Sequence, residues 1–124
     1  MFDIRINSFE NRLYIALKGT IEQPEAAQGY NKLVKAMNSL APGFSVITDI
    51  RELAPATADV RFIFVNMIQL LIKSQMAIEV RVVHPKDPAA AQIFERISRS
   101  LGYSAEEVHT VSEAERIIDK FFGA

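Results

Sequence analysis

The stretch PGFSVITDI, residues 42–50, carries the clearest fold signal in this chain. Pro42-Gly43 breaks helical structure, and the run from Phe44 to Ile50 is β-branched and mostly apolar. A run of this kind is typical of a strand that is buried on both faces. Such strands occur in sheets with helices packed on either side, so the stretch predicts an α/β fold.

Amphipathic helices are predicted on both sides of this strand. Pro24 suits the first turn of a helix that runs to the Pro42-Gly43 stop. Apolar residues recur in it three and four positions apart, at Ala26, Tyr30, Leu33, Val34, Met37 and Leu40. After the strand, residues 51–56 form a loop, and Thr57 or Asp59 can cap a second helix that ends near Lys73.

The C-terminal half continues the alternation of strands and helices. A strand is predicted over 77–83, followed by a third helix that starts at Asp87-Pro88 and ends at Gly102. A last short strand over 107–111 leads into a capping box at 112–115 and a final helix. The apolar faces of these two helices are Ala90, Ile93, Phe94, Ile97 and Leu101, and then Ile117, Ile118, Phe121 and Phe122.

The N-terminus predicts a β-hairpin. Apolar residues alternate with polar ones in 2–7 and again in 12–17, and the residues between them favour a turn. The element order is therefore β-β-α-β-α-β-α-β-α. It predicts a mixed, mostly parallel sheet with one antiparallel N-terminal hairpin and about four helices, in a single domain over residues 1–124.

Composition narrows the functional classes. The formal net charge of −1 provides no electrostatic footprint for nucleic acid or anionic lipid. The absence of cysteine excludes disulfides and thiolate metal sites and fits a reducing cytoplasm. The N-terminus lacks a secretion signal, and the most apolar stretch, 62–72, is too short to span a bilayer. We therefore expect a cytoplasmic protein that neither inserts into membranes nor binds nucleic acid.

Catalytic motifs of the common types are missing, including both phosphate-binding glycine loops, G-x-S-x-G and H-E-x-x-H. His84 is expected at the carboxyl end of a strand, where open α/β sheets bind ligands, but a simple strand-closing role is favoured. His109 is expected inside the last strand, with a functional role still less favoured than for His84. Asp49 and Glu52 could form a catalytic carboxylate pair, although a solvated loop with ion pairs is favoured. We predict no catalytic residue, metal or cofactor, and no enzymatic activity.

Several segments resemble the STAS domain family, which includes bacterial anti-sigma-factor antagonists. Residues 12–19 are similar to its second strand, which ends in glycine, and 44–50 to its central strand, which ends in Asp. Residues 82–85 and 112–115 resemble its last two β-α units. The resemblance covers essentially the whole chain. It implies a SpoIIAA-like fold and a non-enzymatic, regulatory role in protein-protein recognition.

The same resemblance implies a phosphorylation site at the start of the second helix. Typical members carry a phosphorylatable serine there, roughly nine residues after the Asp that ends the central strand. That position falls on Ala58 here, and the neighbouring glycine is also missing. Thr57, one residue earlier, is the phosphorylation candidate, since a helix N-terminus favours a phosphate. A plain N-cap role for Thr57 is the favoured alternative.

The second helix has more apolar residues than one buried face requires. Phe62 and Val65 fall inside its polar arc and Ile72 lies at the edge of that arc, so they predict an exposed apolar patch beside Gln69. The alternative is that a loop or Phe121-Phe122 covers them. With the preceding loop, the predicted partner-binding residues are Asp49, Arg51, Glu52, Thr57, Phe62, Val65, Gln69 and Ile72.

Two functions remain open from sequence. The first is a regulatory module that binds a protein partner or a second copy of itself as a homodimer. The second is a small-molecule or lipid-binding domain of the same fold, which a ligand-sized pocket beneath the second helix would favour.

Overall fold

Five strands form one mixed sheet in the order β1-β2-β3-β4-β5 in the computed structural model, which describes residues 1–123. β1 and β2 pair antiparallel, and the remaining neighbours are parallel. The elements are β1 (Phe2–Asn7), β2 (Arg12–Leu17), α1 (Gln23–Ala36), η1 (Met37–Ser39), β3 (Ser45–Asp49), α2 (Ala58–Lys73), β4 (Ile78–Val82), α3 (Ala89–Ser100), β5 (Glu106–Val108) and α4 (Val111–Phe121). The predicted α/β class, hairpin and element order are confirmed.

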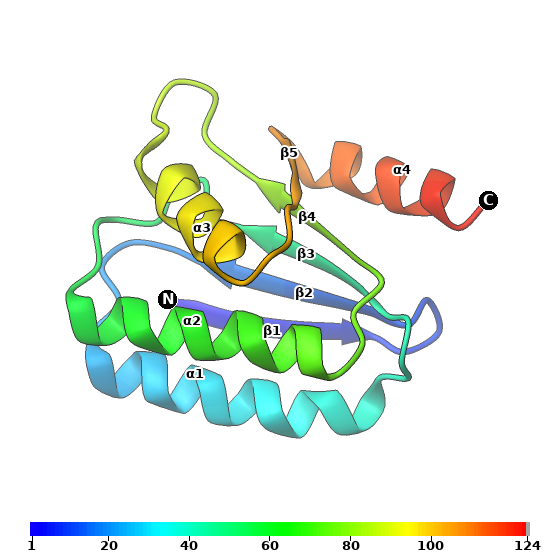
Figure 1. Ribbon diagram of the computed structural model, residues 1–124, viewed down its shortest axis with the longest axis horizontal. Helices are drawn as coiled ribbons and strands as arrows, with labels where there is room; N and C mark the ends of the chain where they lie inside the picture. The colour runs from blue at the N-terminus through cyan, green and yellow to red at the C-terminus, as the bar shows by residue number, and fades with distance from the viewer. Residues whose placement is uncertain (124) are drawn as a thin grey trace.

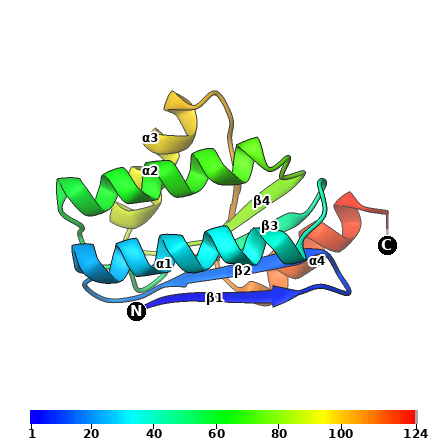
Figure 2. The same ribbon diagram turned by 90° about the horizontal axis from the view of Figure 1, so that it is seen from below.

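Helices cover the two faces of the sheet unequally. α1, α2 and α3 pack on one face and α4 on the other (Figures 1 and 2). β3 is the central strand, and its residues Ser45 to Thr48 are buried, as predicted for a strand covered on both sides. Val46 belongs to the larger core under α1, α2 and α3, whereas Ile47 belongs to the smaller core under α4. No helix among residues 1–123 is long and apolar enough to cross a membrane.

Three local predictions were wrong. The last strand spans 106–108 rather than 107–111, so His109 follows the strand instead of lying in it. α4 begins at Val111, and its N-cap is Thr110, whose Oγ1 accepts from the N–H of Glu113 at 3.1 Å. The N-cap is therefore Thr110 rather than Ser112, because Thr110 in the extended conformation precedes the first helical residue. In α1, which ends at Ala36 before the short η1 turn, Val34 is exposed rather than part of the core.

Candidate functional site

The outer surface of α2 carries exposed apolar side chains. The Phe62 ring is 64% exposed, Ile72 is 38% exposed, and Val65 is half-buried between them along the helix. The inner side of the same helix is filled by Val60, Phe64, Met67, Ile68 and Leu71, all buried. Phe121 and Phe122 do not cover the patch, since they end α4 on the other face of the sheet and are 56% and 54% exposed.

The loop before α2 is held in place by a glycine. Gly19 has a φ of +66°, a left-handed backbone conformation that favours glycine. Its N–H donates to the Glu52 carbonyl at 2.8 Å, and its carbonyl accepts from the Ala54 N–H at 3.1 Å. The glycine that ends the β2 segment therefore fixes the 51–56 loop against the carboxyl end of the sheet.

Asp49 and Arg51 form an internal ion pair at this end of β3. Arg51 donates to both carboxylate oxygens, through Nε at 3.0 Å and a terminal nitrogen at 2.8 Å, and its backbone N–H donates as well. Burial of the Asp49 carboxylate raises its pKa, but the hydrogen bonds and charge of Arg51 outweigh burial and hold the pKa below its ordinary value. Asp49 thus organises the loop, and its carboxylate is already occupied.

The Asp49–Arg51 pair predicts an acid-dependent loss of stability. Because the pKa of Asp49 is lower in the folded state, its contribution is complete above about pH 4 and is lost as the pH falls through the folded-state pKa. We expect Asp49→Asn to reduce the difference between urea midpoints measured at neutral pH and at about pH 3. Asp3→Asn is the control, since Asp3 is exposed with no ion pair within residues 1–123. Equal pH dependence in Asp49→Asn and the unmodified protein would contradict this prediction.

Glu52 and Thr57 lie further along the same loop. The Glu52 carboxylate is exposed and 3.7 Å from the Lys18 ammonium. Thr57 occupies the N-cap position of α2 and is exposed, but its side chain does not cap the helix. Its hydroxyl instead donates to the Asp59 carboxylate, a hydrogen bond that lowers the pKa of Asp59. Thr57 is therefore the N-cap residue, as the alternative predicted, but its side chain makes no capping hydrogen bond.

The three side chains considered for catalysis are not brought together. Asp49 pairs with Arg51, Glu52 lies near Lys18, and exposed His84 accepts the backbone N–H groups of residues 86 and 87 on Nδ1, each at 3.0 Å. No hydrogen bond joins any two of Asp49, Glu52 and His84 within the described chain. Across residues 1–123, no three His, Cys, Asp or Glu side chains gather as a metal site would require.

Several hollows border α2. A groove of about 470 Å³ separates it from α3 and is lined by Phe62, Val65, Ile93 and Ile97. A small, almost wholly apolar crevice of about 60 Å³ lies between the 53–56 loop and the start of α3. A wider hollow of about 570 Å³ opens at the other end of the sheet, between Ile72, Tyr103 and Phe121.

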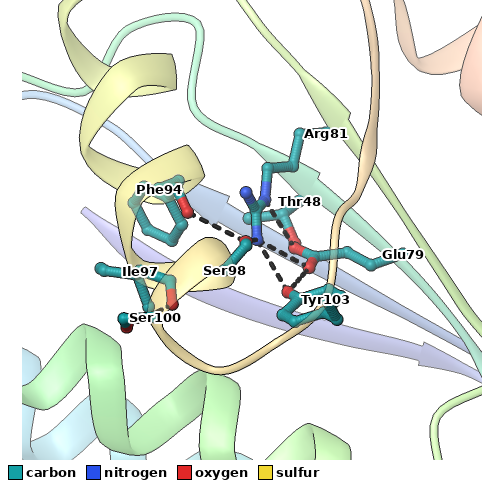
Figure 3. A network of polar contacts seen from close by, with 8 residues as sticks. All are labelled: Thr48, Glu79, Arg81, Phe94, Ile97, Ser98, Ser100 and Tyr103. Carbon is teal, nitrogen blue, oxygen red and sulfur yellow. Dashed lines mark hydrogen bonds and ion pairs between the residues drawn. The ribbon is translucent and has the colours of Figure 1, made fainter.

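A buried polar network beneath α3 was missed by sequence reasoning (Figure 3). The Arg81 guanidinium donates to both oxygens of Glu79, at 3.0 and 3.2 Å, and their side chains are 1% and 0% exposed. Thr48 donates to the same carboxylate at 2.7 Å, Tyr103 also donates to it, and Ser98 accepts from Arg81. Every lone-pair position of Glu79 is used, so the network anchors α3 and its following loop to the sheet.

The electrostatics of this network follow from its burial. Burial raises the pKa of Tyr103, and the charge of Glu79 raises it further, so the phenol stays protonated and donates. Desolvation lowers the pKa of Arg81, but the charge and hydrogen bonds of Glu79 outweigh it and raise the pKa overall. One signal in the sequence could have exposed the network. Glu79 and Arg81 alternate with valines in a strand predicted to lie inside a helix-covered sheet, where both faces are buried.

Comparison with solved structures identifies the architecture. The unphosphorylated form of the anti-sigma factor antagonist SpoIIAA matches with a TM-score of 0.68, at 13% identity and over 100% of both chains. The phosphorylated form, described as a Bacillus cell fate determinant, matches with a TM-score of 0.65, at 13% identity, over 95% of this chain and 99% of that one. The chain has a SpoIIAA-like fold.

A third structure extends the comparison. An uncharacterised protein of the DUF3478 family from Shewanella loihica, also with a SpoIIAA-like fold, matches with a TM-score of 0.68 and 12% identity, over 94% of this chain and 91% of that one. No protein-family model matches the sequence, and neither does any curated protein. At these identities the likeness shows the SpoIIAA-like fold and leaves function to be argued from the site.

Proposed function

We propose that this protein is a non-enzymatic regulatory module that binds a protein partner, or a second copy of itself, through the outer surface of α2 and the loop before it. The observation that carries the proposal is the 64% exposure of the Phe62 ring beside Val65 and Ile72. A large aromatic side chain held in solvent on an ordered helix is typical of an interface anchor. SpoIIAA, which shares the fold, is described as an anti-sigma factor antagonist, and this supports a regulatory role.

Thr57 belongs to this proposal as the phosphorylation candidate. Its exposure and its place at the N-terminus of α2 support modification, because free N–H groups and the helix dipole favour a phosphate. Asp59, which accepts the Thr57 hydroxyl, opposes it by like charge. The 51–56 loop is fixed by Gly19, so a phosphate on Thr57 would change the charge of the surface more than its shape.

Charge placed in the α2 patch tests the proposal. We expect Phe62→Asp/Val65→Asp to weaken association tenfold or more, since the substitutions remove the exposed aromatic anchor and place charge in an apolar contact. Self-association is measured by size exclusion with light scattering. Partner binding is measured by capture from a lysate of the source organism with mass spectrometry.

The controls separate binding from folding. Phe62→Asp alone removes the anchor without touching half-buried Val65, and circular dichroism reports whether either variant folds. Phe9→Asp is the matched control, because Phe9 is 95% exposed at the hairpin turn and does not belong to α2. Assembly and capture that are the same for Phe62→Asp and Phe9→Asp would contradict the proposal.

A second candidate function is small-molecule or lipid binding, favoured by the hollow of about 570 Å³ near Ile72 and Tyr103. Its volume lies in the range of ligand sites, and its walls include Met76, Ile117 and Phe121. Native mass spectrometry of the purified protein tests it. A co-purifying small molecule, with binding of proteins unaffected by Phe62→Asp, would favour this function over the first.

A further inference from the structure

The groove between α2 and α3 lies beside the first half of α2. Phe62 and Val65 face Ile93 and Ile97 at one end. A second hollow lies further along α2, lined by Gln69, Ile72 and Leu101. At 1.5 Å per residue, the α2 side from Phe62 to Lys73 is about 16 Å long, which is about three helical turns.

Basic side chains border this groove. Arg61 of α2 and Arg96 of α3 line its walls, and Lys73 lines the second hollow. None of the three has a carboxylate within 4.0 Å among residues 1–123. Arg61 donates to the Ala56 carbonyl and keeps its other donors free. An apolar floor thus lies between unpaired positive charges.

We infer that this groove binds an amphipathic helix of a different protein, with Asp or Glu residues flanking its apolar stripe. The inference rests on the proposed function and adds the chemistry of the partner. Two neighbouring helices form a groove that a third helix fills with its side-chain ridge. Carboxylates on both flanks of that ridge would meet Arg61 on one side and Arg96 on the other.

A second copy of this chain fits the groove less well. A two-fold interface places the same patch on both sides, so Arg61 and Arg96 would face their own counterparts. Like charges across an interface oppose association. A small anionic amphiphile is also disfavoured, since ligand sites bury most of the ligand surface, whereas Phe62 beside the groove is 64% exposed.

Selection from a displayed peptide library tests the inference. The library consists of helical peptides about five turns long, with a fixed apolar stripe and every flanking position randomised. It is selected in parallel against the full chain and against Arg61→Glu/Arg96→Glu. We expect the unmodified protein to enrich Asp and Glu at the flanks and the charge-reversed protein to enrich Lys and Arg. The acidic peptides should bind the reversed protein about tenfold or more weakly, and their affinity should fall between about 50 and 500 mM salt.

The outcomes distinguish this inference from the proposed function. Peptides that lose binding with Phe62→Asp but show no acidic preference would overturn the inference and leave the proposed function standing. Peptides indifferent to Phe62→Asp would overturn both. Failure to enrich any helix, or binding of dodecanoate or phosphatidylglycerol vesicles with no peptide enriched, would also overturn the inference. Arg61 and Arg96 are exposed, so the reversed protein should fold, and circular dichroism is the check.

Discussion

Replacement of Arg81 by methionine is expected to lower the free energy of unfolding by about 3–5 kcal/mol. The substitution keeps most of the side-chain volume but leaves the Glu79 carboxylate, which is 0% exposed, with donors from Thr48 and Tyr103 alone. A buried charge that loses its counter-charge retains its full desolvation penalty. Urea denaturation at neutral pH measures the change.

A second substitution, at Glu79, shows whether the stability loss in Arg81→Met comes from the unpaired charge or from altered packing. We expect Glu79→Leu/Arg81→Met to be less destabilised than the sum of the two single variants, because no unpaired charge remains. Arg99→Met is the matched control. Arg99 lies on the exposed surface of α3, where it pairs with Glu95. Its expected effect is at most about 1 kcal/mol. A loss below that level in Arg81→Met would show that water reaches the pair.

Gly29→Ala is expected to destabilise the protein by about 1–2 kcal/mol, although alanine is the better helix former. Gly29 lies in α1 directly over the Phe2 ring of β1, and a Cβ at this position would lie 2.4 Å from that ring. Overpacking a filled core costs about 1–3 kcal/mol, whereas removal of a helical glycine returns about 1 kcal/mol. The close approach of α1 to the hairpin therefore makes the expected effect of Gly29→Ala on stability unfavourable.

A smaller side chain at position 2 checks this explanation. Phe2→Leu makes room above β1, so Gly29→Ala should cost less in that background than in the unmodified protein. Gln28→Ala is the control, because it changes an exposed neighbour in the same helix. Thermal unfolding of the unmodified protein, the two single variants and the double variant gives the coupling energy between positions 2 and 29. An unchanged or raised melting temperature in Gly29→Ala would show that the Phe2 ring moves aside without strain.

The spacing of apolar residues was sufficient to predict the features of the fold that depend on a single strand or helix. The alternation in 2–7 predicted β1, and the β-branched run ending at Ile50 predicted a central strand covered on both faces. The polar arc of α2 predicted that Phe62 is exposed, because the angular position of a residue on a helix follows from its number. The glycine at the end of the second strand was implied by the family resemblance, and Gly19 has the left-handed φ that favours this residue.

Contacts between elements distant in sequence were beyond that reasoning. Glu79 and Arg81 lie on β4 in a sheet predicted to be covered by helices, but their partners Thr48, Ser98 and Tyr103 come from distant parts of the chain. The groove also depends on contacts between distant elements, since Arg61 and Arg96 are 35 positions apart and lie on its α2 and α3 walls.

The sequence by itself determined the α/β class, the element order and the exposed patch on α2, because hydrophobic period and turn chemistry act over a few residues. The tertiary structure decided which charges are paired. It buries Glu79 with Arg81 and pairs Asp49 with Arg51. Within residues 1–123 it places no carboxylate within 4.0 Å of Arg61 or Arg96, which lie beside Phe62. Charge pairing depends on distances between elements that are far apart in the sequence. Only the tertiary structure therefore shows that exposed Phe62 lines a groove bordered by Arg61 and Arg96.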